Sequence, residues 1–169
     1  GHIYNPSLRP YEVIGGSSGT RDDRYAFTGN YSPAGQMPTI AAMAAAARAL
    51  KDYNPEISAK ALNLAVKLWN ENFEAADPAN TQNQNNRWMR GDQRTEAAIQ
   101  LWRATGEQKY KDFFLPKVLA DLKTKRLNNA LELYPLLDDD FKAAVKAAVP
   151  AYVKGVEETA AENPYGVPV

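Results

Sequence analysis

The chain has 169 residues, in which 20 Lys and Arg balance 20 Asp and Glu, with no cysteine and a single histidine at position 2. This length suits one domain, and the balanced charge gives no field that would attract phosphate backbones or anionic lipid, so neither nucleic acid nor membrane is an expected partner. Thiol catalysis, disulfides, a Ser-His-Asp triad and a His-rich zinc site are excluded, which leaves acid–base chemistry to carboxylates, Tyr or Lys.

The first 35 residues are rich in Gly, Pro, Ser and aromatic residues, and they follow neither a helical nor a strand period. Because Gly and Pro interrupt regular structure, this pattern predicts an ordered arm with a short extended piece at Tyr11–Ile14. A helical period runs from Gln36 to residue 162, and residues 163–169 are expected to form an exit segment. The predicted fold class is all-α, with the helices arranged as consecutive antiparallel hairpins.

Six helices are expected, separated by corners that Pro or Gly mark. They cover about 36–53, 56–76, 92–105, 107–122, a short segment that Pro135 ends, and a long helix after Asp138–Asp140. Pro38 is expected in the first turn of the first helix, and Gly106 is expected to end the third helix in a left-handed turn. Pro116 is expected to kink or restart its helix, and Pro150 is expected to kink the last helix.

Apolar stripes at helical spacing predict which sides of these helices are buried. Trp69, Leu101 and Trp102 are expected in a shared core. The second helix is expected to bury the side formed by Ile57, Ala61, Leu64, Ala65, Leu68 and Trp69. The last helix is expected to bury the side formed by Phe141, Val145, Ala148, Tyr152, Val153 and Val156.

Three segments of the chain resemble the catalytic domain of glycoside hydrolase family 9, the cellulase-like enzymes. Residues 92–106, DQRTEAAIQLWRATG, are similar to the family's DERxWAAAELYRATG, with Glu96 in place of Trp and Trp102 in place of Tyr. Asn163–Pro168 has the sequence NPYGVP, which resembles the run that follows a long helix in the family. Tyr31–Gly35 and the helices after it resemble the family's Ser/Pro-rich loop, Ala-rich helix and following helix.

The resemblance implies an (α/α)6 toroid of six hairpins, of which residues 1–169 hold about half, as a single domain or a domain fragment. It also implies inverting hydrolysis of β-1,4-linked glucan or related oligosaccharides in the full-length, exported protein. The family's catalytic aspartate lies in an Asp-Ala-Gly-Asp motif and its catalytic glutamate near the domain's C-terminus. Neither motif is present, so no catalytic residue, metal or cofactor is assigned. The alternative is a non-catalytic helical-repeat module that binds protein or glycan.

The candidate substrate contacts are loop residues, because loops at helix ends line the active site of such toroids. Asp22 and Asp23 are candidates to accept sugar hydroxyls, although their Arg neighbours also fit a surface turn neutralised by ion pairs. Tyr25 and Tyr31 offer aromatic faces to a pyranose ring. Trp88 fits a sugar platform or a plug over the helix ends equally well.

Two further features have structural interpretations. Asp92 and Arg94 match the family's segment, and Asp92 is also a suitable N-cap for the helix that follows. Asp138–Asp140 lack the alternate spacing of a calcium loop and suit a helix start. Half of a ring exposes apolar helix flanks, so self-association is expected, or an N-terminal arm that covers the gap, with the Ile40–Leu50 or Val145–Val156 face at the junction.

Overall fold

The computed structural model describes residues 2–3, 25–26, 32–80, 92–124 and 126–162. The chain divides into two compact units, residues 1–32 and 33–169, which are described separately below.

In the first unit, β1 (His2–Ile3) pairs with β2 (Tyr25–Ala26) in an antiparallel ladder. His2 lies opposite Ala26, and Ile3 lies opposite Tyr25. The sequence predicts no strand at either place, because an alternation of period two cannot be recognised in two residues. The extended piece predicted at Tyr11–Ile14 lies outside the described residues.

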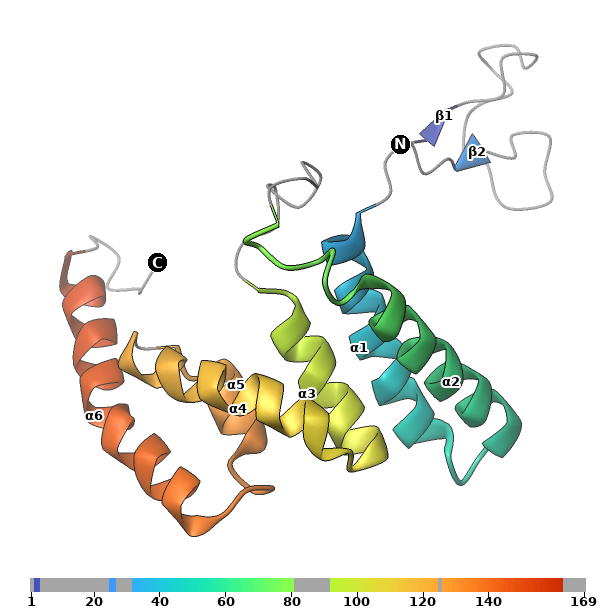
Figure 1. Cartoon of the computed structure of the whole chain (residues 1–169). Helices are drawn as coiled ribbons and strands as arrows, with labels where there is room; N and C mark the ends of the chain where they lie inside the picture. The colour runs from blue at the N-terminus through green and yellow to red at the C-terminus, as the bar shows by residue number, and fades with distance from the viewer. Residues whose placement is uncertain (1, 4–24, 27–31, 81–91, 125, 163–169) are drawn as a thin grey trace, which may run out of the picture. The chain divides into compact units, whose positions relative to one another are not determined.

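The second unit is helical (Figure 1). Its helices are α1 (Pro33–Leu50), α2 (Pro55–Asn72), α3 (Arg94–Thr105), α4 (Gln108–Lys123), α5 (Asn128–Leu133) and α6 (Asp139–Glu162). Each predicted helix is present, and the bounds differ by a few residues. The first helix starts at Pro33, so Pro38 lies inside it and not in its first turn as predicted.

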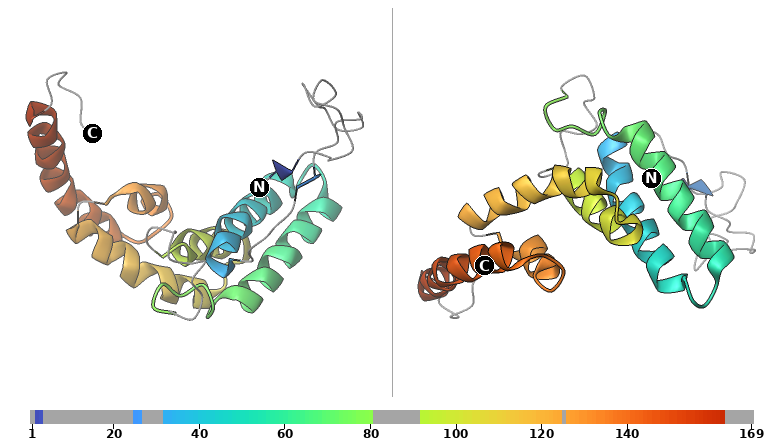
Figure 2. Two further views of the ribbon diagram at one scale, coloured as in Figure 1. Left: turned by 90° about the horizontal axis from the view of Figure 1, so that it is seen from above. Right: turned by 60° about the horizontal axis from the view of Figure 1, so that its bottom comes forward.

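The first hairpin joins α1 and α2, which lie side by side in both views of Figure 2. Asn54 caps α2 by accepting a hydrogen bond of 3.1 Å from the Ile57 amide, and Pro55 is the first helical residue. The Ser58 hydroxyl donates to the Ala47 carbonyl at 2.7 Å and ties the two helices together. Because α2 and α3 both pack on α1, Ala41, Ala44 and Ala47 lie in the core, whereas Ala42, Ala46 and Ala49 are exposed.

Helix α3 is the central element, since it packs against both α1 and α4. Ala97, Ala98, Leu101 and the unpredicted Ile99 are fully buried. Trp102 is only half-buried, with its ring edge-on to Phe114 at 5.5 Å, so the prediction of a buried Trp102 is wrong in part.

A left-handed residue separates α3 from α4. Gly106 has φ +73° and ψ +2°, and its amide bonds the Trp102 carbonyl, so the predicted glycine corner is confirmed. Helix α4 then continues through Pro116, so this proline does not restart the helix, and α6 likewise continues through Pro150.

An aromatic cluster connects α2 with α4. The buried Trp69 contacts Tyr110 at 5.5 Å and Phe113 at 5.8 Å between ring centroids, while Phe73 contacts Phe113 at 5.1 Å. The predicted burial of Trp69 is therefore confirmed.

The outer parts of two predicted stripes are exposed. On α2, Ile57 and Leu64 face away from the core, because the helix buries the side that carries Ala65 and Trp69. On α6, only Phe141 and Val145 are buried, so the predicted burial of Tyr152 and Val153 is wrong. The start of α6 is as predicted, since the Asp138 carboxylate accepts a hydrogen bond of 3.0 Å from the Phe141 amide.

Candidate functional site

The predicted substrate contacts fall where the structure gives no side-chain geometry. Asp22, Asp23, Tyr31 and Trp88 lie outside the described residues. Tyr25 lies in β2 and pairs with Ile3 through the backbone, and its side chain is not described. These five residues therefore remain predictions from the sequence.

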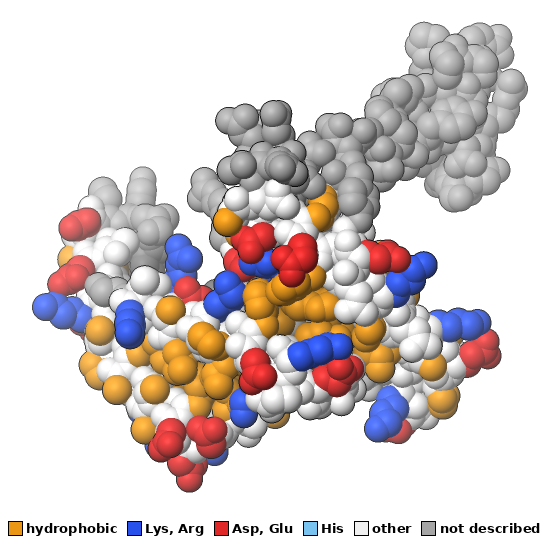
Figure 3. Space-filling model, in the orientation of Figure 1, with side chains coloured by type: hydrophobic (Ala, Val, Ile, Leu, Met, Phe, Trp, Pro, Cys, Tyr) orange, Lys and Arg blue, Asp and Glu red, His pale blue; other side chains and the backbone are white. Residues whose placement is uncertain are grey.

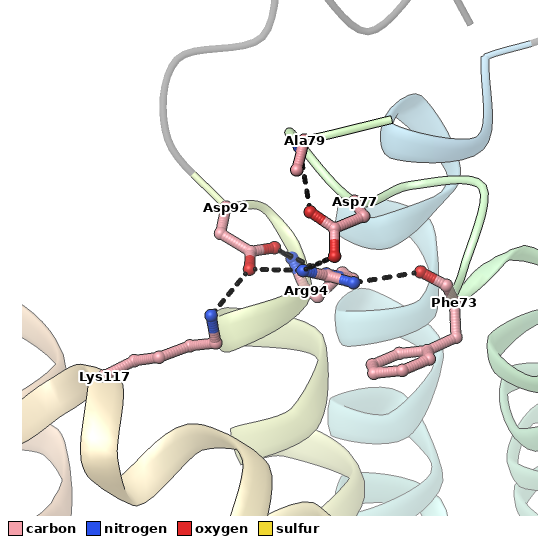
Figure 4. Close-up of polar contacts among 6 residues, drawn as sticks. All are labelled: Phe73, Asp77, Ala79, Asp92, Arg94 and Lys117. Atoms are coloured by element: carbon pink, nitrogen blue, oxygen red, sulfur yellow. Dashed lines mark hydrogen bonds and ion pairs between the residues drawn. The ribbon is translucent and has the colours of Figure 1, made fainter. Parts of the chain in front are cut away.

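The strongest polar site among the described residues forms around Arg94 at the start of α3 (Figure 4). We call Phe73, Asp77, Asp92, Arg94, Phe113 and Lys117 the Arg94 cluster. The Arg94 side chain is only 5% exposed, although a guanidinium is seldom buried without partners. Its partners come from the end of α2, from the residues before α3, and from α4.

Asp92 holds the guanidinium with both of its oxygens. Oδ1 accepts from Arg94 Nε at 2.8 Å and from the Arg94 amide at 3.1 Å, and Oδ2 accepts from Nη2 at 2.8 Å. The same Oδ2 lies 3.0 Å from the Lys117 ammonium. Asp92 thus satisfies an amide at the start of α3 as predicted, although the assigned N-cap residue is Gln93, and it also links α3 to α4.

Asp77 supplies a second carboxylate from the residues that follow α2. Its Oδ2 lies 3.0 Å from Arg94 Nη2, and its Oδ1 accepts a hydrogen bond of 2.9 Å from the Ala79 amide. Arg94 Nη1 also donates to the Phe73 carbonyl at 3.3 Å. The Arg94 guanidinium therefore joins the end of α2 and Asp77 to the start of α3.

Two aromatic rings complete the cluster. The guanidinium carbon of Arg94 lies 4.9 Å from the Phe73 ring centroid and 5.2 Å from that of Phe113. The Lys117 ammonium lies 4.8 Å from the Phe113 centroid. Cations at such distances are attracted to the ring faces, more strongly where water is excluded.

Mutual pairing fixes the charge states of the cluster. Burial by itself raises the pKa of Asp92, but hydrogen bonds from Arg94 and Lys117 and the charge of Arg94 outweigh burial, so the pKa is lowered. The Ala79 amide and Arg94 lower the pKa of Asp77. Burial lowers the pKa of Arg94, but the two carboxylates outweigh burial and raise it.

The cluster is therefore suited to holding helices together and not to general acid catalysis. Its two carboxylates balance its two cations, and each carboxylate is kept ionised by hydrogen bonds, whereas a catalytic acid needs a raised pKa. The sequence indicated Asp92 and Arg94 but not Asp77, Phe113 or Lys117. Their role depends on contacts between distant segments, and no local spacing in the chain signals it.

A second polar network crosses α3 further along. The Gln100 side-chain amide donates to Glu96 at 3.0 Å and to Glu132 of α5 at 2.8 Å, and its oxygen accepts from Arg48 of α1. Arg103 pairs with the same Glu132. Burial, and then the charge of Arg103, lower the pKa of Arg48. We call these five residues the Gln100 network.

Two surface hollows lie near these helices. One of about 270 Å³ lies beside α1 and α2 and is lined by Ala47, Arg48, Lys51, Pro55, Ser58, Ala59, Leu62 and Ala104. The other, of about 390 Å³, is lined by Asp121, Arg126, Leu127, Asn128, Asn129 and Tyr152. Neither lining contains the two carboxylates that a glycosidase needs.

Within the described parts of the chain, no group of three or more Asp, Glu, His or Cys side chains is placed to hold a metal ion. Among the same residues, no helix has the length and apolar character that crossing a bilayer requires.

The geometry thus defines an all-α domain of helical hairpins whose contacts meet at α3. Residues 16–159 match the model of glycosyl hydrolase family 9. The chain belongs to this family, and its antiparallel hairpins are those of the family's (α/α)6 toroid fold. The comparisons with curated proteins and with solved structures find no match.

Proposed function

We propose that these residues are the central part of an enzyme that, in its full-length form, hydrolyses β-1,4-linked glucan or related oligosaccharides with inversion. The observation that carries the proposal is the family match, which spans residues 16–159 and so includes helices α1 to α5 and most of α6. A glycoside hydrolase function follows from family membership. The linkage and the stereochemistry are the finer part of the proposal and rest on the resemblance of the three sequence segments.

Inverting hydrolysis needs one carboxylic acid to protonate the leaving oxygen and one carboxylate to activate water on the opposite face of the sugar. The family's Asp-Ala-Gly-Asp motif does not occur in this sequence. Asp77 and Asp92 are committed to Arg94. The isolated chain is therefore expected to be inactive and to contribute scaffold and substrate contacts.

Those contacts are proposed for Asp22, Asp23, Tyr25, Tyr31 and Trp88. Carboxylates accept hydrogen bonds from sugar hydroxyls, and aromatic rings present an apolar face with a defined geometry.

The test compares the 169-residue chain with the polypeptide encoded by the complete open reading frame. We expect the longer polypeptide to release reducing sugar from mixed-linkage β-glucan or soluble cellulose and to produce the α-anomer first, as proton NMR detects. The 169-residue chain should release none. A longer polypeptide that binds β-glucan without turnover would contradict the proposal and favour a binding module. Turnover by the isolated chain that is lost in Asp22→Asn or Asp23→Asn would contradict the proposal that the catalytic carboxylates lie outside these 169 residues.

A further inference from the structure

The hollow beside α1 and α2 gathers positive charge without a matching carboxylate. We call it the α1–α2 hollow. Its volume is about 270 Å³, and the charged side chains in its lining are those of Arg48 and Lys51. The other lining residues are apolar except for Ser58, whose hydroxyl already donates to the Ala47 carbonyl. A hollow that is lined by charge of one sign on an apolar wall attracts ions of the opposite sign.

The α1–α2 hollow lies between packed helices. Ala47 and Arg48 belong to the last turn of α1, Pro55 and Ser58 to the first turn of α2, and Ala104 to the last turn of α3. In Figure 1 these helix ends lie at the same end of the helices, opposite to the start of α3. Helix α1 packs against both α2 and α3. The hollow is therefore formed by neighbouring hairpins that are both present, and it does not belong to the open flank of α6.

The guanidinium of Arg48 has donors that its own chain does not use. Among the described residues its side chain makes one hydrogen bond, from Nη2 to the Gln100 side-chain oxygen, although a guanidinium has five N–H donors. Its Nε is buried and has no hydrogen-bond partner there. Burial and the charge of Arg103 lower the pKa of Arg48, while the charge of Glu132 acts in the opposite direction. An anion beside Arg48 would compensate a charge that these neighbours compensate only in part.

Lys51 supplies the second positive charge, three residues after Arg48. It is exposed, and within the described residues it forms no ion pair. The nearest carboxylates in the sequence are those of Asp52 and Glu56. Neither lines the hollow, and the Glu56 carboxylate lies 2.7 Å from the Lys60 ammonium. The Lys51 ammonium is therefore available to a ligand.

We propose that the α1–α2 hollow binds a small organic anion, with its carboxylate between Arg48 and Lys51 and its apolar part against Ala59, Leu62 and Ala104. The planar fork of arginine donors matches the two oxygens of a carboxylate. The volume is just below the range of roughly 300–1,000 Å³ that is typical of pockets for drug-sized ligands, so a ligand with a short apolar chain fits. The proposal does not depend on which glycan the full-length protein hydrolyses.

The test uses hexanoate as the probe and hexanamide, its uncharged analogue, as the control ligand. Binding is followed by proton–nitrogen correlation NMR of the 169-residue chain. We expect hexanoate to shift the backbone amides of the lining residues in a saturable way, with a dissociation constant in the millimolar range, as a ligand of this size allows. Hexanamide should bind roughly fivefold more weakly or less, because it lacks the charge.

Charge variants locate the site. Lys51→Glu replaces an attraction by a repulsion and should weaken hexanoate binding roughly fivefold to tenfold. The matched control is Lys67→Glu, which changes the net charge by the same amount at an exposed position of α2 that does not line the hollow. It should bind hexanoate as the wild type does. Arg48→Gln removes the guanidinium and should also bind more weakly, with far-ultraviolet circular dichroism to establish that it is folded.

Four results would overturn the proposal: no saturable shift of these amides with millimolar hexanoate, equal binding of hexanamide, undiminished binding by Lys51→Glu, or an equal loss in Lys67→Glu. The two lysine variants keep the test decisive if Arg48→Gln fails to fold, because both lysines are exposed.

Discussion

Replacing Arg94 by methionine is the most direct test of the Arg94 cluster. Methionine keeps an unbranched apolar stem between Phe73 and Phe113, so the substitution mainly removes the charge and its hydrogen bonds. The substitution removes the guanidinium that both oxygens of Asp92 contact, and the Asp92 side chain is only 17% exposed. It also removes the ion-pair partner of Asp77. The effect therefore measures how strongly one buried cation joins α2, α3 and α4.

The expected loss is set by the burial of the partners. Removing one member of a buried ion pair costs about 3–5 kcal/mol, because the other charge stays behind without compensation. Asp77 is 39% exposed and Asp92 keeps its contact with Lys117, so both carboxylates retain some solvation or charge balance. We therefore expect about 3 kcal/mol in the free energy of unfolding, which corresponds to a fall in melting temperature of about 6–12 °C for a chain of this size.

The assay is urea and thermal unfolding followed by far-ultraviolet circular dichroism. Lys60→Met is the matched control, since Lys60 lies 2.7 Å from Glu56 but the two side chains are 73% and 78% exposed. An exposed pair one turn apart on a helix contributes about 0.3–0.5 kcal/mol. An Arg94→Met variant that is unfolded at 25 °C agrees with the prediction. Losses for the two variants that agree within about 0.5 kcal/mol would refute the reasoning.

Two further predictions concern acid and the corner after α3. The pKa of Asp92 is lowered in the folded state, so its stabilising contribution is present above the ordinary aspartate pKa of about 3.9 and is lost as the pH falls through the lower folded value. The stability difference between wild type and Asp92→Asn should thus be large at pH 7 and shrink below about pH 4; a difference that does not change between pH 7 and pH 3 would contradict it. Gly106→Ala should lower the free energy of unfolding by about 1–2 kcal/mol, because a residue with a Cβ is strained at φ +73°. No steric clash adds to this cost, since the added methyl group meets no atom within 4 Å. Unchanged urea unfolding of Gly106→Ala would show that the left-handed corner is not required.

The helices could be predicted because their signals are local. The end of α3 at Gly106 follows from the backbone preference of a single residue. The buried side of each helix was less predictable, since it depends on how many neighbours pack there. Helix α3 packs against α1, α2 and α4 and buries Ile99 together with the predicted Leu101, whereas α2 leaves Ile57 exposed.

The candidate site was harder to predict for a physical reason. Asp92 and Arg94 lie two residues apart and were recognisable in the sequence, but Asp77 and Lys117 reach them only through the packing of α2 and α4 on α3. Residues that form ion pairs between distant segments are not marked by any regular spacing in the sequence. The predicted sugar contacts came from the composition of loops, and the structure describes none of their side chains.

The polar contacts of α3 have a role that its apolar contacts cannot supply. Ala97 and Ala98 are fully buried and let neighbouring helices approach closely. Their methyl groups provide little shape complementarity, however, so they define the axial position of α3 only weakly. Arg94 fixes the beginning of α3 to α2 and α4, and Gln100 fixes its middle to α1 and α5. Sliding α3 along its neighbours would separate buried charges from their partners, which costs far more than moving one methyl group past another. Arg94→Met should therefore reduce the near-ultraviolet circular dichroism of the packed aromatic side chains before it reduces the helical signal, and a variant whose near-ultraviolet signal is unchanged would show that apolar packing alone sets the register.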